Sequence, residues 1–232
     1  DETPDYVFVS SFNPVRREIA KMALESLLAD GRINPTTIEQ AVAAARREIE
    51  DKTFSYGAEA LDSLGITRVA PELTALLGKL NFHSSLNQNT LEHSIETACL
   101  AGLIASEINC DVMTAKRAGL FHDIGKAVPD QNLSHAKAGA AALLKYGESQ
   151  GVVNAVEAHH SEVEAESVYA IIVQTADALS ATRRGARMEA TEGYIKRVKS
   201  LEGIALSFEG VASAYVLQAG RELRVMVSPD SV

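Results

Sequence analysis

The sequence predicts a mainly α-helical protein with one short β-strand near the N-terminus and a β-hairpin at the C-terminus. Alanine-rich runs with few β-branched residues fill most of the chain, and their apolar residues recur at helical spacing. Helix-capping residues precede several of these runs. Of the 232 residues, 46% are apolar, which is enough for a sizeable core and excludes wholesale disorder.

The first predicted elements are a strand and two helices. Residues 6–10 (Tyr-Val-Phe-Val-Ser) have the composition of a strand, although one that is too short to be stable alone. Helices are expected over about 14–30 and 35–51. The pairs Asn13-Pro14 and Asn34-Pro35 each place a capping side chain before a proline at the first helical position.

The chain from residue 52 to residue 207 predicts a series of helices with short connections, and a linker around 51–66 is weakly marked. The expected helices cover residues 52–64, 71–80, 88–108, 112–124, 134–147, 149–160, 166–183 and 189–207. The tail changes character, because 214–217 and 223–227 have the composition of two strands joined by a loop.

The net charge and the cysteine content narrow the possible classes of function and the expected location of the protein. The net charge of −9 argues against nucleic-acid binding through overall charge, so phosphate chemistry would need local cations or bound metal. Cys99 and Cys110 are too few for a disulfide framework and indicate reduced cytosolic thiols. No signal peptide or membrane-spanning run is present, and the chain does not begin with Met. We therefore expect a soluble, cytoplasmic piece of a longer protein.

Most of the histidines fall in one part of the sequence. Five of the six lie between positions 93 and 160, namely His93, His122, His135, His159 and His160. His122 and Asp123 end a predicted helix and are followed by Gly125 and Lys126, so the two side chains can reach one centre from different sides. Asp177 lies inside an apolar helix, where a bare carboxylate is costly unless it is paired or bound to a cation.

These side chains predict a divalent metal site. His93, His122, Asp123 and Asp177 are the expected ligands of one ion. The set contains no thiolate, so it suits Mn²⁺, Fe, Zn²⁺ or Mg²⁺. A metal held in this way would lower the pKa of a bound water and neutralise charge on a phosphoryl oxygen, which is hydrolytic chemistry.

The other three histidines could complete a second metal site. His135, His159 and His160 could instead have structural roles. His135 follows the capping residue Ser134, and the pair 159–160 at a helix end could complement the helix dipole. His83 is expected to be a loop histidine.

Several cations are candidates for substrate binding. Lys126 lies one turn beyond the His-Asp pair and could contact a phosphate oxygen as a point charge. Arg183, Arg184 and Arg187 form a local positive band after the Asp177 helix. Such a band is either a solvated face or a phosphate-binding surface, to which the guanidinium fork is suited.

The pattern His93…His122-Asp123…Asp177 resembles the HD phosphohydrolase superfamily in its His-Asp-Ile-Gly variant. Longer segments resemble one group within that superfamily in the right order along the chain, namely 13–20, 28–33, 115–127, 176–181 and 218–223. This resemblance implies a metal-dependent endoribonuclease that starts the decay of single-stranded messenger RNA and leaves 5′-phosphate products. It implies one or two ions, with Mn²⁺ or Mg²⁺ preferred and Zn²⁺ or Fe as alternatives.

The resemblance also implies a domain organisation. Residues 1–51 would be the end of a KH RNA-binding module with a helical connection, 52–207 the HD domain, and 208–232 part of a C-terminal β-hairpin region. The Gly-x-x-Gly loop of a KH module is not present, because no two of the fifteen glycines are three positions apart. The sequence departs from the family's usual pattern at 84–89, at 130–134 and at Arg184.

Further implications concern location and partners. The full-length family carries a coiled coil and an N-terminal anchor that attaches it to the inner face of the cell membrane, although this fragment would not touch the membrane. Single-stranded RNA, a second copy in a homodimer and the RNA-decay machinery are the expected partners.

Within the endoribonuclease hypothesis, Asp123 would orient or deprotonate the attacking water, and Lys126 would stabilise developing charge. Two other functions fit the same residues. The site could belong to an HD phosphohydrolase acting on nucleotides or cyclic dinucleotides, or the metal could be structural in an assembly module.

Overall fold

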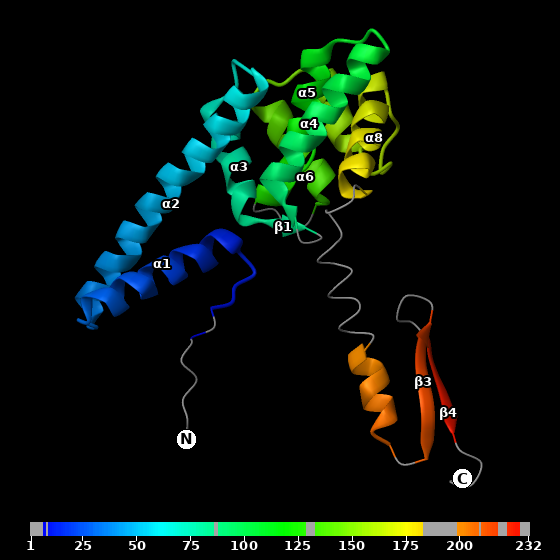
Figure 1. Ribbon diagram of the computed structural model, residues 1–232. Helices are drawn as coiled ribbons and strands as arrows, with labels where there is room; N and C mark the ends of the chain where they lie inside the picture. Colours follow the sequence, from blue (N-terminus) through cyan, green and yellow to red (C-terminus); the bar gives the residue numbers. More distant parts are fainter. Residues whose placement is uncertain are drawn as a thin grey trace. The chain divides into compact units, whose positions relative to one another are not determined.

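The computed structural model describes residues 7, 9–85, 88–128, 133–182, 199–208, 210–217 and 222–227. These residues are mainly helical, as the sequence predicts, and the chain divides into two compact units, Asp1–Ala181 and Thr182–Val232 (Figure 1). The helices of the first unit are α1 (Pro14–Asp30), α2 (Pro35–Leu64), α3 (Pro71–Lys79), η1 (Leu80–Phe82), α4 (Thr90–Glu107), α5 (Val112–Phe121), η2 (Ile124–Ala127), α6 (His135–Lys145), α7 (Gln150–Ala158) and α8 (Val168–Thr182).

The two helices α1 and α2 form an antiparallel pair joined by a short turn (Figure 1). Their starts are confirmed, because Asn13 accepts a hydrogen bond from the Arg16 amide at 3.0 Å and Asn34 caps α2 in the same way. The predicted break near residue 51 is wrong. Helix α2 runs on because its buried stripe continues beyond that point at helical spacing, through residues 45, 49, 53, 57, 60, 61 and 64.

Glycines let the helical pair dock onto the rest of the unit. A Cβ on Gly78 of α3 would lie 1.6 Å from the carbonyl oxygen of Thr53, and one on Gly57 of α2 would lie 2.0 Å from that of Thr74. Because glycine has a hydrogen where other residues have a side chain, the two helix backbones can approach this closely.

The strand predicted at residues 6–10 is not found in the described part of that segment. Residues 7, 9 and 10 have no strand structure, and residues 6 and 8 lie outside the described residues. A strand requires a hydrogen-bonded neighbour. Among the described strands, β1 (Ser84–Ser85) pairs only with β2 (Gln88–Asn89), and β3 (Val211–Leu217) pairs only with β4 (Glu222–Val227).

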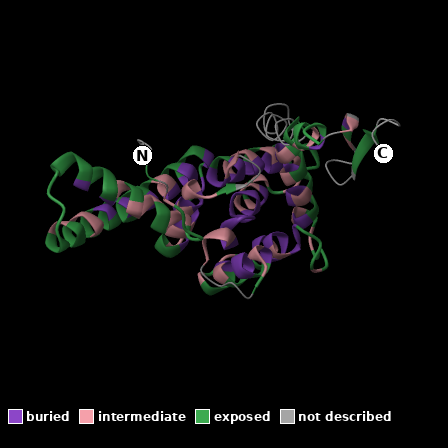
Figure 2. Ribbon diagram, turned by 90° about the horizontal axis from the view of Figure 1, so that it is seen from below, coloured by how far each residue is buried: buried purple, intermediate pink, exposed green. Residues whose placement is uncertain are grey.

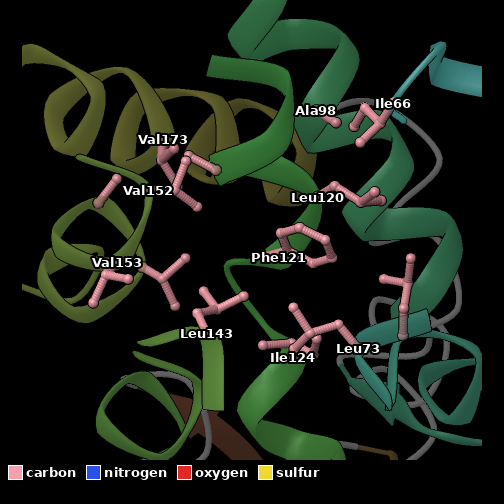
Figure 3. Packing of buried hydrophobic residues seen from close by; sticks show 14 of the residues in the cluster. Ile66, Leu73, Ala98, Leu120, Phe121, Ile124, Leu143, Val152, Val153 and Val173 are labelled. Carbon is pink, nitrogen blue, oxygen red and sulfur yellow. The ribbon is translucent and has the colours of Figure 1, made fainter. Parts of the chain in front are cut away.

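The buried residues gather in the bundle formed by α3 to α8, whereas the α1–α2 turn is exposed (Figure 2). Leu120, Phe121 and Ile124 lie in the centre of this core with no exposed surface, and Leu73, Leu143 and Val173 pack around them (Figure 3). These central residues flank His122 and Asp123 in the sequence, so core packing holds the backbone of the His-Asp pair.

The other predicted helices of the bundle have the expected positions within two residues, apart from the one expected over 112–124. Helix α5 ends at Phe121, because Asp123 leaves the helical region with φ −100° and ψ 5°, and the 3-10 turn η2 follows. The short β1–β2 pairing joins Ser84–Ser85 to Gln88–Asn89, so the first two residues of the helix predicted over 88–108 belong to a strand instead.

The second unit contains a helix over 199–206 and the antiparallel β3–β4 hairpin, which confirms the predicted hairpin. The amide of Val216 donates to Glu202 Oε1 at 3.1 Å and joins the helix to the hairpin. The part of the predicted 189–207 helix before residue 199 lies outside the described residues. Within the described ranges, no helix has the length and apolar character that a membrane span requires.

Candidate metal centre

Five separate elements bring the predicted ligands to one place. His93 comes from the first turn of α4, His122 and Asp123 follow α5, and Asp177 comes from α8. His135 is the first residue of α6, and His159 and His160 follow α7. The imidazole rings of His93, His122, His159 and His135 succeed one another with centroids 5.1, 5.3 and 5.3 Å apart.

The end of α5 fixes the orientation of His122. Its side chain is 1% exposed, and its Nδ1 lies 2.8 Å from the carbonyl oxygen of Gly119. Because a carbonyl oxygen only accepts, Nδ1 carries the hydrogen and Nε2 carries the lone pair. That Nε2 faces Asp123 Oδ2 at 3.5 Å and Asp177 Oδ1 at 3.8 Å.

His93 is oriented by a chain of hydrogen bonds from α8 back to α4. The hydroxyl of Ser180 donates to Glu96 Oε2 at 2.7 Å, and its oxygen lies 2.9 Å from His93 Nδ1. Since the only hydroxyl proton goes to the carboxylate, the oxygen accepts from Nδ1–H. The Nε2 of His93 is then the free ring nitrogen, and it lies 3.0 Å from Asp177 Oδ1.

The three remaining histidines form the second group of ring nitrogens. The Nδ1 of His159 lies 2.5 Å from the carbonyl oxygen of Val156, and its Nε2 is buried without a hydrogen-bond partner among the described residues. The Nε2 atoms of His135 and His160 are 3.0 Å apart. A buried ring nitrogen without a partner is unfavourable unless a ligand binds it, so His159 points to a bound cation.

Asp123 lies between the two groups. Its Oδ2 faces His122, while its Oδ1 is 3.5 Å from His135 Nε2. The ammonium of Lys126 is 2.6 Å from Oδ2. The carboxylate is 3% exposed, so these neighbours replace the water that it would otherwise bind.

The charge states of these groups suit metal binding. Burial lowers the pKa of His122 and of His135, and burial together with the nearby His122 imidazole lowers the pKa of His159 to about 3. Burial opposes ionisation of Asp123, but the His122 imidazole and the Lys126 ammonium outweigh it and hold the pKa of that carboxyl below its usual value. Neutral imidazoles and ionised carboxylates are the forms that coordinate a cation.

Asp177 is ionised for a similar reason. Burial acts to raise the pKa of its carboxyl, but the adjacent imidazoles of His93 and His122 lower that pKa below its usual value. Its Oδ1 therefore joins the lone-pair nitrogens of both histidines as a negatively charged donor.

Gly125 of the motif positions α6. A Cβ on this residue would lie 1.8 Å from the carbonyl oxygen of His135 and 2.6 Å from the amide nitrogen of Gly139. The missing side chain lets η2 pack directly against the start of α6, which carries His135 toward Asp123. The glycine thus has a packing role beside the two candidate ligands of the motif.

The donors fit a divalent metal ion at two adjacent positions. His93, His122 and Asp123 offer ligand atoms that all lie within 4.8 Å of one another, and so do His135, His159 and His160. Asp177 approaches the first group through its contacts with His93 and His122. Four buried or half-buried nitrogens and two carboxylates without a thiolate are typical of hydrolytic metal sites.

The structure does not describe every predicted substrate-binding residue. Lys126 is placed, and its ammonium pairs with Asp123. Arg183, Arg184 and Arg187 lie outside the described residues, as do residues 86–87 and 129–132 of the two divergent segments.

Sequence reasoning missed the residues that orient the ligands. Ser180 and Glu96 were not singled out, yet together they determine which nitrogen of His93 faces the site. Each follows a predicted ligand by three positions on the same helix, Glu96 after His93 and Ser180 after Asp177. That i, i+3 spacing was the signal that could have found them.

Residues 90–182, from the start of α4 to the end of α8, match the family model of the HD domain. This range contains all seven candidate ligands and the helices that carry them. The fold and the site therefore define this part of the chain as an HD domain.

The chain as a whole is homologous to ribonuclease Y. It is 54% identical to ribonuclease Y of Opitutus terrae, 52% identical to that of Thermoanaerobacter pseudethanolicus and 50% identical to that of Enterococcus faecalis. Each match covers 100% of this chain but only 45%, 46% and 45% of the relative, respectively. The chain thus spans slightly less than half the length of these relatives. No solved structure matches it.

Proposed function

We propose that this chain is the catalytic part of a metal-dependent endoribonuclease that hydrolyses phosphodiester bonds of single-stranded RNA and so starts messenger RNA decay. The position of Asp123 between two sets of histidine nitrogens carries the proposal. Sites that hold two adjacent ions clamp the attacking and leaving oxygens of a phosphoryl group. The relatives bear the name of a ribonuclease, which supports RNA as the substrate.

The two ions would be held by different residues around one shared carboxylate. His93, His122 and Asp177 would hold one ion, and His135, His159 and His160 the other, with Asp123 serving both. When bound, such ions supply positive charge for phosphoryl oxygens and make water acidic enough to attack near neutral pH.

The chain's own residues would orient the reactants. Asp123 is a weak base because its pKa is held low, so we assign it to orienting the attacking water. Lys126 balances the charge of Asp123 and would place a positive charge beside the phosphate. Arg183, Arg184 and Arg187 are proposed to bind phosphates of the RNA backbone.

The donor set favours a transition-metal ion over Mg²⁺. Mg²⁺ prefers oxygen ligands and retains several waters, whereas this site offers five imidazole groups and two carboxylates. Among the transition metals, the family resemblance favours Mn²⁺, so we propose Mn²⁺ as the activating ion and Mg²⁺, Fe and Zn²⁺ as the comparisons in a metal panel.

Cleavage of a circular single-stranded RNA tests the proposed activity, because a circle has no ends and only an endonuclease can open it. We expect linear products with 5′-phosphate ends in the presence of Mn²⁺ and none after chelation. Asp123→Asn should abolish cleavage, whereas Asp62→Asn, at an exposed position of α2, should not affect it.

Two results would contradict this proposal. Hydrolysis of nucleotides or cyclic dinucleotides with the circle left intact would instead identify a nucleotide phosphohydrolase. Stoichiometric metal binding without hydrolysis of any phosphate ester, combined with unfolding on chelation, would identify a structural metal.

For the whole protein we propose the further features that the family resemblance implies. These are a KH module, a membrane anchor, a homodimer and association with the RNA-decay machinery. The relatives are about twice as long as this chain, which leaves room for such segments. Size measurement by light scattering, on this chain and on the full-length protein, tests the dimer.

A further inference from the structure

A groove of about 590 Å³ lies between the N-terminus of α1, the segment from Lys79 to His83, and η2. Its volume is within the range of protein sites that bind small molecules or parts of larger ligands. The side chains of Arg16, Lys79 and Lys126 line it together with His83, and none of the described residues that line it carries a carboxylate. On a chain with a net charge of −9, this surface is locally positive.

Two of these cations are available to a ligand. Within the described ranges, neither Arg16 nor Lys79 forms an ion pair. The groove also lies at the N-terminus of α1, a helix of 17 residues, whose dipole adds partial positive charge. Phosphate groups are the ligands that such an arrangement favours.

The groove also offers contacts for a base and a ribose. Phe12 is fully exposed at 108% relative accessibility, which places a bare aromatic ring on the groove wall. The Nδ1 of His83 lies 2.9 Å from the Lys79 carbonyl oxygen and therefore donates to it. Its Nε2 has no partner among the described residues, so it can hydrogen-bond to a ribose hydroxyl.

The groove reaches the metal centre through Lys126. This residue lines the groove, and its ammonium is 2.6 Å from Asp123 Oδ2. A strand lying along Arg16 and Lys79 would therefore lead to the carboxylate that both groups of histidines share.

We infer that this groove receives a segment of single-stranded RNA next to the scissile bond, with phosphates at Arg16 and Lys79 and a base against Phe12. The inference rests on the proposed function. Single-stranded RNA fits better than a duplex, because stacking on an aromatic side chain requires an unpaired base.

Binding of a fluorescent single-stranded RNA to the chelated protein tests the groove without cleavage. The double variant Arg16→Ala/Lys79→Ala should bind more weakly, and the slope of log K against log salt should fall by about 1.4, since each lost phosphate contact contributes about 0.7. The matched control is Arg46→Ala/Arg47→Ala, which removes two exposed charges of α2 that do not line the groove. Equal slopes for both double variants would overturn the inference.

Phe12→Ala tests the stacking contact separately. We expect it to weaken binding of single-stranded RNA by about fivefold to more than a hundredfold, the range that loss of one base–aromatic stack produces. Binding of double-stranded RNA, which should be weak already, should not change. Equal losses for the two RNAs would show that Phe12 has no stacking role.

Hydrolysis of bis(p-nitrophenyl) phosphate with Mn²⁺ separates failure of this inference from failure of the proposed function. This small diester needs the metal centre but not the groove. The Arg16→Ala/Lys79→Ala variant should hydrolyse it at the original rate while its KM for RNA rises. A normal KM for RNA in this variant would refute the groove alone. If the unchanged protein hydrolyses neither substrate, the proposed function is refuted.

Discussion

Ser180 of α8 and His93 of α4 are 87 positions apart in the sequence, yet the serine oxygen lies 2.9 Å from the histidine Nδ1. Because the serine hydroxyl donates to Glu96, its oxygen must accept from Nδ1–H. This contact selects the tautomer whose Nε2 can coordinate a metal. A polar side chain outside the candidate ligand set thus orients a candidate ligand for metal binding.

Ser180→Ala should weaken metal binding without unfolding the protein. Loss of a hydrogen bond that orients a ligating histidine typically lowers affinity by about 10- to 100-fold. Titration calorimetry with Mn²⁺ measures this, and Ser94→Ala is the matched control. Ser94 is also fully buried but has no hydrogen-bond partner among the described residues. Equal affinities in the two variants would contradict the assigned role of Ser180.

Gly125→Ala should destabilise the protein because its Cβ would meet backbone that cannot swing away. The carbonyl oxygen of His135 would be 1.8 Å from it. We expect a loss of about 3 kcal/mol in the free energy of unfolding, measured with urea. The control Gly151→Ala, in α7, has no atom closer than 4.0 Å and should raise stability by about 0.5–1 kcal/mol. Similar effects of the two substitutions would contradict the close approach of η2 to α6.

Acid should destabilise the metal-free protein, partly through His159. Its pKa is about 3 in the folded chain, against about 6.5 when unfolded. The unfolded chain therefore binds more protons between these values, so stability is complete above the unfolded pKa and declines as the pH falls toward 3. The lowered pKa values of His122 and His135 act in the same direction.

His159→Gln should remove part of that acid sensitivity. Urea unfolding in the presence of a chelator should show that the stability difference between about pH 7.5 and pH 5 shrinks by about 2 kcal/mol. An unchanged difference would mean that His159 is protonated equally in the folded and unfolded states.

Arg117→Ala should be among the most destabilising changes outside the metal centre. Its guanidinium binds both oxygens of Glu148, at 2.6 and 2.7 Å, and the carbonyl oxygens of Thr67 and Arg68. The Glu148 side chain is 5% exposed, so its charge would be left buried and unpaired. We expect a loss of about 3–5 kcal/mol by urea unfolding.

The double variant Arg117→Ala/Glu148→Ala supplies the comparison. Removing both partners leaves no unpaired charge, so this variant should recover part of the lost stability. Additive losses in the double variant would show that the two side chains stabilise the protein independently.

Much of the helical architecture was predictable because its signals are local. Asn13 and Asn34 begin their helices through contacts within one turn. The two errors have different causes. The stretch around residue 51 has no local break, so it extends α2, while residues 7, 9 and 10 find no strand partner within the described chain.

For the candidate site too, residue choice follows from the sequence, whereas the geometry follows from the packing of distant segments. Residue chemistry and order along the chain were sufficient to select His93, His122, Asp123 and Asp177, and the structure brings them together with the other three histidines. Spacing could not reveal that Asp123 faces both groups, because that depends on the approach of α6 over Gly125.

The amino-acid sequence by itself determined where helices begin, which side chains can ligate a metal and that the chain is helical, since these depend on residue type and short-range spacing. The tertiary structure alone decided which histidine nitrogen faces the centre, which carboxylate lies between the two groups and where unpaired cations line a groove. Those features require atoms from distant segments to meet within a few ångströms, and only the packing of helices against one another sets such distances.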